Sequence, residues 1–101
     1  MKLLIITTVD AHKPALIKML KAADIGAYSS ADISGHKKQD SKALRDHWFA
    51  AANHLVDSEL YFSFVAGDKI DSLFTSLREY NHEIEDHSPI RAVVVPIEQS
   101  L

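Results

Sequence analysis

Apolar and polar positions divide the chain into strand-like and helix-like segments. Residues 2–9 (KLLIITTV) form a β-branched, almost wholly apolar run, which predicts a strand buried on both faces. In residues 15–23 the apolar side chains recur at helical spacing and form one stripe. Asp10 can cap this helix, and Gly26 is expected to end it. Residues 27–37 alternate weakly, which predicts a second, more exposed strand.

The second half of the chain repeats this order. Residues 58–68 (SELYFSFVAGD) alternate between two faces, which predicts a strand that ends in a glycine-aspartate turn. Residues 69–84 give the strongest helix signal, with apolar side chains at i, i+3, i+4 and i+7. These side chains are Ile70, Leu73, Phe74 and Leu77. Residues 90–97 (IRAVVVPI) predict a last buried strand, which Pro96 stops.

The order of the predicted elements indicates a fold class. Strand, helix, strand, strand, helix, strand is the split βαβ pattern of ferredoxin-like α+β folds. Right-handed crossovers place both helices on one face of a four-stranded antiparallel sheet. Strand side chains alternate between faces, so the apolar strand residues cannot all point at the helices. They include Ile6, Phe62, Phe64 and Val94. We therefore expect an uncovered apolar sheet face and self-association through it.

Composition narrows the class of protein. The 101 residues make a single domain, 1–101, of which 47% are hydrophobic and 25% charged. A net charge of −3 argues against a nucleic-acid partner, because such binding needs a basic surface. The apolar run near the start is too short to span a membrane, so we expect no direct membrane insertion. The chain has no cysteine, which fits a cytoplasmic protein.

One segment between the second and third predicted strands differs from the rest. Residues 34–54 (SGHKKQDSKALRDHWFAAANH) contain three of the six histidines, four lysines or arginines and the only tryptophan. Most of this segment falls in a long connection at about residues 36–57.

The order of the elements, the length and three short strings resemble a known family, the nitrogen-regulatory PII proteins, whose superfamily also contains the CutA divalent-cation-tolerance proteins. One string, FVAGDKIDSLFTSL (residues 64–77), is similar to the family's join between a strand and a helix. The string ISGHKKQ is similar to the base of the long PII T-loop, with Gly35, Lys38 and Gln39 on the matching positions. Lys38 stands there for an arginine, and Lys37 replaces a glycine. The string IRAVVVPIEQ resembles the PII ending, with Arg91 in place of a phosphate-binding lysine.

The resemblance implies a homotrimer whose uncovered sheet faces pack together. It also implies a small anionic ligand, such as an adenine nucleotide, in the clefts between subunits. The implied ligand-binding residues are Gly35, Lys37, Lys38, Gln39 and Arg91. Residues 36–57 would be the T-loop, which signals to a transporter or enzyme target.

The stretch before the last strand departs from the family pattern. PII proteins have a glycine-rich phosphate loop there, whereas NHEIEDHSP (residues 81–89) has no glycine and three acidic residues. The resemblance is therefore to divergent PII-like proteins rather than to the nitrogen regulators themselves.

The histidines leave a second hypothesis open. His36, His47 and His54 carry imidazole ligands suited to a divalent metal ion, as expected of a CutA-like metal-tolerance protein. His82 and His87 flank acidic residues and offer another cluster. The alternative is that all of them are surface residues, and no HxH or HxxxH spacing occurs.

The remaining signals of residues 34–54 also have two interpretations each. The lysines and arginine form either an anion site or a solvated charged surface. Trp48 and Phe49 either pack against the domain on a short helix or bind a partner. No Ser-His-Asp or Cys-His pattern is present, so we expect that the protein is not an enzyme.

Overall fold

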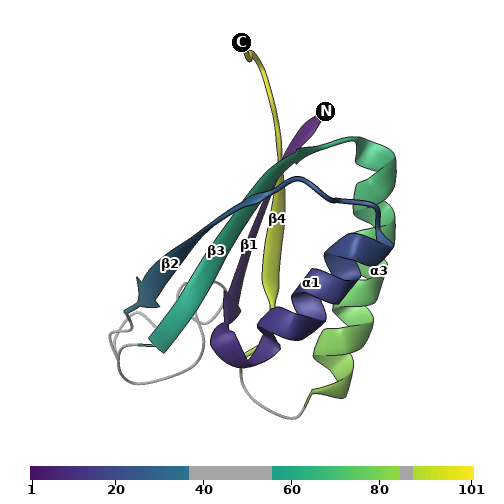
Figure 1. Ribbon diagram of the computed structural model, residues 1–101. Helices are drawn as coiled ribbons and strands as arrows, with labels where there is room; N and C mark the ends of the chain where they lie inside the picture. Colours follow the sequence, from purple (N-terminus) through teal and green to yellow (C-terminus); the bar gives the residue numbers. More distant parts are fainter. Residues whose placement is uncertain (37–55, 85–87) are drawn as a thin grey trace.

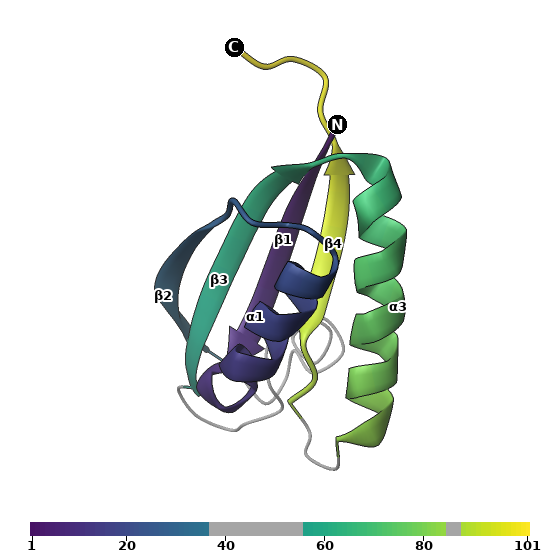
Figure 2. The same ribbon diagram turned by 45° about the vertical axis from the view of Figure 1, so that its right-hand side comes forward.

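The computed structural model describes residues 1–36, 56–84 and 88–101 (Figure 1). Its elements are β1 (Lys2–Val9), a 3-10 helix (Asp10–His12), α1 (Lys13–Ala22), β2 (Ser29–Gly35), β3 (Val56–Val65), α3 (Gly67–Glu83) and β4 (Arg91–Pro96). The strands form one sheet in the order β2-β3-β1-β4, and every neighbouring pair is antiparallel. Both helices lie on the same face of the sheet (Figures 1 and 2). The predicted ferredoxin-like α+β fold is confirmed.

The first helix ends differently from the prediction. Asp10 lies inside the 3-10 helix, and α1 has no side-chain cap hydrogen bond. The helix ends before Gly26, because Asp24 adopts a left-handed backbone conformation with φ of 60°. The N–H of Ile25 then reaches back to the Leu20 carbonyl at 2.9 Å. Lys69 at the start of α3 donates to the Asp24 carbonyl at 2.9 Å, which holds this turn in place.

The elements of the second half also begin at other residues than predicted. Residues 56 and 57, which the sequence assigns to the long loop, belong to β3. The expected glycine-aspartate turn is wrong, because Gly67 and Asp68 form the first turn of α3. Asp68 is favourable there, since a carboxylate complements the positive end of the helix dipole. β2 is shorter than predicted at both ends and begins at Ser29.

The hydrophobic core lies between the sheet and the two helices. Its side chains come from the helix-facing side of the central strands, from the inner stripes of both helices and from the residue before β4. The fully buried members are Leu4, Ile6, Leu16, Leu20 and Leu73. On β3 the predicted alternation is confirmed: Tyr61 and Val65 are buried, whereas Phe62 and Phe64 are exposed.

The opposite side of the sheet carries apolar side chains that neither of the two described helices, α1 and α3, covers. Strand register places Leu3 between Phe64 and Val95, and Ile5 between Phe62 and Val93. Phe64 is 57% exposed and Phe62 is 39% exposed. We call this set the uncovered face: Leu3, Ile5, Phe62, Phe64, Val93 and Val95.

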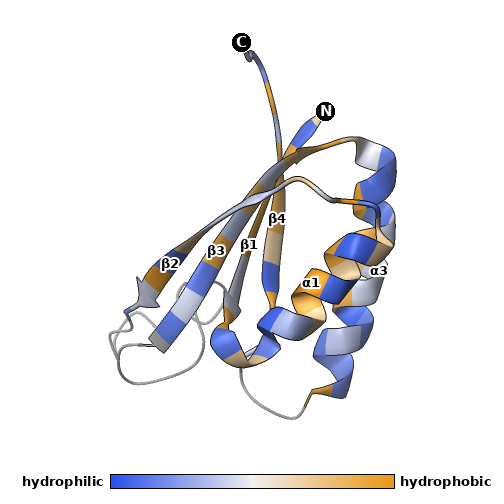
Figure 3. Ribbon diagram, in the orientation of Figure 1, coloured by the Kyte–Doolittle hydropathy of each residue, from blue (hydrophilic) through white to orange (hydrophobic). Residues whose placement is uncertain are grey.

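Helix α3 is amphipathic. Ile70, Leu73 and Leu77 are buried against the sheet, and Figure 3 shows polar residues interspersed with apolar ones along its length. In the ranges that the structure describes, neither helix is long and apolar enough to cross a membrane.

Candidate functional site

The structure places two of the predicted ligand residues, Gly35 and Arg91, on the same side of the sheet. Ile90 points into the core, so Arg91, the next residue, points to the other side, where Val93 and Val95 lie. Arg91 is half-buried and pairs with Thr7 of β1. Gly35 is buried at the end of β2. It lies on the same side of the sheet as Ser29, which pairs with Phe62 of the uncovered face.

Within one chain, however, these two residues do not form one site. The register row that contains Arg91 continues through Thr7 and Leu60 to Ala31, three strands away. Gly35 lies four residues farther along β2 than Ala31. With strands about 4.8 Å apart and about 3.3 Å per residue, Gly35 and Arg91 are roughly 20 Å apart. A small ligand that contacts a Gly35 and an Arg91 at once would therefore need the two residues to come from different copies of the chain.

Arg91 follows a residue that is held by a side chain of α3. Asn81 donates from Nδ2 to the Ile90 carbonyl at 2.9 Å, and its Oδ1 accepts the Ile90 N–H at 2.9 Å. The preceding residue, Tyr80, contacts the buried His12 through a 2.7 Å hydrogen bond between its hydroxyl and Nδ1. The last turns of α3 therefore connect to the 3-10 helix between β1 and α1 and to the residue before β4. Sequence reasoning did not identify Asn81, because its role depends on this tertiary contact.

Beside the uncovered face, the start of β2 and the end of β3 enclose an open hollow. Its volume is about 490 Å³, and its lining residues are Gly26, Ala27, Tyr28, Ser29, Phe62, Ser63 and Phe64. Ser63 donates to the Ala27 carbonyl at 2.6 Å, which fixes the segment before β2. We call this the β2–β3 hollow. Exposed aromatic rings beside hydroxyl groups can stack on a planar ligand and bond its polar edge.

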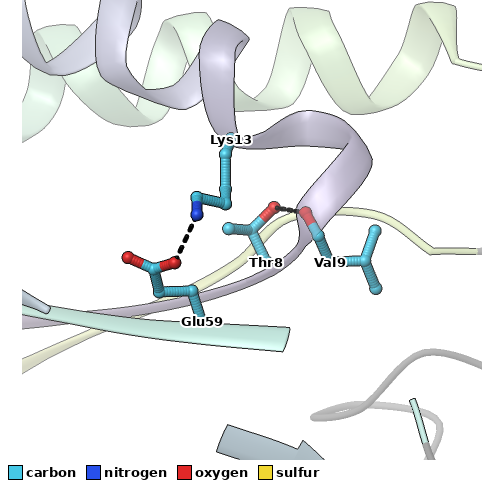
Figure 4. Close-up of polar contacts among 4 residues, drawn as sticks. All are labelled: Thr8, Val9, Lys13 and Glu59. Atoms are coloured by element: carbon cyan, nitrogen blue, oxygen red, sulfur yellow. Dashed lines mark hydrogen bonds and ion pairs between the residues drawn. The ribbon is translucent and has the colours of Figure 1, made fainter. Parts of the chain in front are cut away.

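A charged pair ties the start of α1 to β3. Lys13 Nζ lies 2.6 Å from a carboxylate oxygen of Glu59, and Figure 4 shows the lysine reaching down from the helix to the strand. The hydrogen bond from Lys13 is the main reason that the pKa of Glu59 is lowered. The same bond raises the pKa of Lys13. Burial raises the pKa of the neighbouring Tyr61. In the same view, the Thr8 hydroxyl donates to the Val9 carbonyl at 3.0 Å.

Comparison with known proteins gives a match in structure but none in sequence. No family model matches the chain, and no curated protein matches it. Among solved structures it is similar to CPII, a nitrogen regulatory PII-like protein from Thiomonas intermedia K12, solved bound to ADP, AMP and bicarbonate. The TM-score is 0.63 over 99% of this chain and 94% of CPII, at 13% sequence identity. The chain has a PII-like fold.

The chain has a second hollow where β2 ends and β3 begins. This hollow has a volume of about 390 Å³, and its lining includes Asp10, Asp32 and Asp57. Three carboxylates at one opening repel an anion, so this hollow is unfavourable for a phosphate. Within residues 1–36, 56–84 and 88–101, no group of three His, Asp or Glu side chains is arranged to hold a metal ion.

Several predicted site residues lie outside the residues that the structure describes. They are Lys37, Lys38 and Gln39 of the ligand set, His47 and His54 of the metal set, and the pair Trp48 and Phe49. Their roles stay predictions. His36 is described and is exposed directly after β2.

Proposed function

We propose that this chain is a PII-like regulatory protein that binds an adenine nucleotide between copies of itself. It acts in the cytoplasm, has no catalytic role, and signals to a transporter or enzyme through residues 36–57. The fold supports this proposal, because it matches CPII along nearly the whole of both chains, and CPII was solved with ADP and AMP.

The uncovered face supports the assembly. Its exposed aromatic and valine side chains form two continuous rows across β3, β1 and β4. Contiguous apolar surface of this kind on a small domain is shielded by a partner, and closed symmetric assemblies of identical chains are the commonest solution. We propose a homotrimer in which the uncovered faces pack together.

The observation that carries the ligand proposal is that Arg91 and Gly35 share one side of the sheet but lie far apart in one chain. Packing copies through that side places residues from different strands at the seams between subunits. Arg91 supplies a charge-assisted hydrogen bond to a phosphate. The β2–β3 hollow supplies aromatic surface for a base, and the predicted residues Lys37, Lys38 and Gln39 complete the site.

Calorimetric titration with ADP and AMP tests the proposal. We expect binding by the unmodified protein, and a loss of about tenfold or more in affinity for Arg91→Ala, because a phosphate loses a charged donor. Arg78→Ala is the matched control, since it removes the same charge from an exposed position on α3. We expect its affinity to be unchanged.

Calorimetric titration with Zn²⁺ distinguishes the metal-binding hypothesis from the nucleotide-binding proposal. Binding of Zn²⁺ that disappears in His36→Ala and His47→Ala, with no heat from ADP or AMP, would replace the nucleotide proposal by a CutA-like one. If Arg91→Ala and Lys38→Ala both bind ADP normally, the residue assignment is wrong even where nucleotide binding is found.

A further inference from the structure

The start of β4 is organised by the amide of a single asparagine. Outside the strand ladder, which begins at Arg91, both backbone polar groups of Ile90 bond to the side chain of Asn81. The two bonds are each 2.9 Å long. They engage the N–H and the carbonyl of one residue, as an antiparallel neighbouring strand does at a hydrogen-bonded pair. Asn81 therefore satisfies both backbone polar groups of the residue directly before β4.

This contact fixes the backbone directly before Arg91. The N–H of Ile90 belongs to the peptide before it, and its carbonyl belongs to the peptide shared with Arg91. Holding both groups fixes the backbone on each side of Ile90, whose side chain is 3% exposed in the core. Because strand side chains alternate, Arg91 is then directed to the side of the uncovered face.

Asn81 acts from a fixed base. Its neighbour Tyr80 packs against the core and meets His12 with ring planes at 82° and a 2.7 Å hydrogen bond. His12 is 6% exposed and directly precedes α1. Tyr80 thus anchors the end of α3 to His12, which lies between β1 and α1. The Asn81 amide bonds the residue before β4.

We propose that Asn81 is a positioning residue, which presents Arg91 to the anionic part of the ligand. This inference rests on the proposed function, because it requires that Arg91 binds the ligand. Asn81 itself does not touch the ligand, since its amide is engaged with the Ile90 backbone. Its effect on affinity passes through Arg91 alone.

A double-mutant cycle with ADP as the probe tests this. The four proteins are the unmodified chain, Asn81→Ala, Arg91→Ala and the double variant. We expect Asn81→Ala to weaken ADP binding about fivefold to tenfold, and to cause no further loss when Arg91 is already alanine. General loosening of the fold would weaken binding equally in both backgrounds, so the cycle separates positioning from stability. Arg78→Ala, at an exposed position one turn earlier on α3, is the control and should bind like the unmodified chain.

A second variant at position 81 keeps the test possible if the first one does not fold. If Asn81→Ala does not fold, Asn81→Asp replaces it in the same cycle, because the carboxylate still accepts the Ile90 N–H but cannot donate to the carbonyl. Equal losses in both backgrounds, or no loss from either substitution at position 81, would overturn the inference. An unmodified chain that does not bind ADP would overturn the proposed function and this inference together, whereas binding with additive losses would overturn only the role of Asn81.

Discussion

Glu59 is a carboxylate on the helix-facing side of β3 that keeps its charge because Lys13 lies above it. The residue is 8% exposed, and its pKa is lowered chiefly by the hydrogen bond from Lys13. A carboxylate whose pKa is lower in the folded state contributes stability above its unfolded pKa and loses it as the pH falls through the folded value. The contribution is therefore complete above the ordinary pKa of 4.5 and disappears in more acidic solution.

We predict that Glu59→Gln lowers the urea midpoint at pH 7 and flattens its decline below pH 4.5. The amide of this variant cannot ionise, so it lacks the charge attraction to Lys13 at pH 7 and has no proton to take up in acid. The measurement is urea unfolding between pH 3 and pH 7. Glu79→Gln is the control, because it makes the same charge change at an exposed position on α3. Parallel pH curves for the unmodified chain and Glu59→Gln would contradict the prediction.

Single residues were predictable where alternation alone decides their orientation. The sequence places Phe62 and Phe64 on one side of β3 and Tyr61 on the other, and the structure agrees. Pairs such as Lys13 with Glu59, or Asn81 with Ile90, depend on how separate elements pack. No local pattern contains that information.

At the scale of elements, the periodicity of each segment predicted its type but not its ends. Every described strand and both described α-helices correspond to a predicted one. The ends differ because they depend on backbone conformation and on contacts between elements. Asp24 adopts a left-handed backbone conformation, and its carbonyl accepts a hydrogen bond from Lys69. Gly67 begins a helix instead of a turn.

The inner stripe of α3 should dominate stability. Leu73 is 0% exposed and packs between α3 and the sheet, so Leu73→Ala removes buried surface and leaves a cavity. We predict a loss of about 2–5 kcal/mol in the free energy of unfolding. Ile17→Ala, at a position of α1 that is 42% exposed, should change it by about 0.5 kcal/mol or less. Chemical unfolding measures both, and similar losses in the two variants would show that the core is placed wrongly.

At the scale of the whole molecule, the uncovered face predicts the assembly. We expect the unmodified protein to be a trimer by light scattering, and Phe62→Asp to reduce the mass toward one chain, because a buried carboxylate has no partner at an apolar interface. Ile17→Asp is a matched control, since Ile17 is 42% exposed and Phe62 39% exposed, but Ile17 lies on the helix side. A monomeric unmodified protein, or dissociation by both variants, would contradict the assembly.

The candidate site was predictable in part. Gly35 and Arg91 came from short strings that resemble PII, and strand alternation explains why both reach the same side of the sheet. The β2–β3 hollow was missed, because the residues before β2 show only weak alternation and its shape arises from β2, β3 and the preceding segment together. Lys37, Lys38 and Gln39 stay predictions.

The strand order also determines which part of the sheet separates first under load. Among the described strands, β2 is bonded only to β3. Five of its seven residues are exposed, and none belongs to the core cluster of the described residues. A pull on the chain just beyond Gly35 therefore peels one row of hydrogen bonds and leaves the β3-β1-β4 layer closed under its helices. We therefore expect β2 to separate from the sheet at a lower force than β1, β3 or β4.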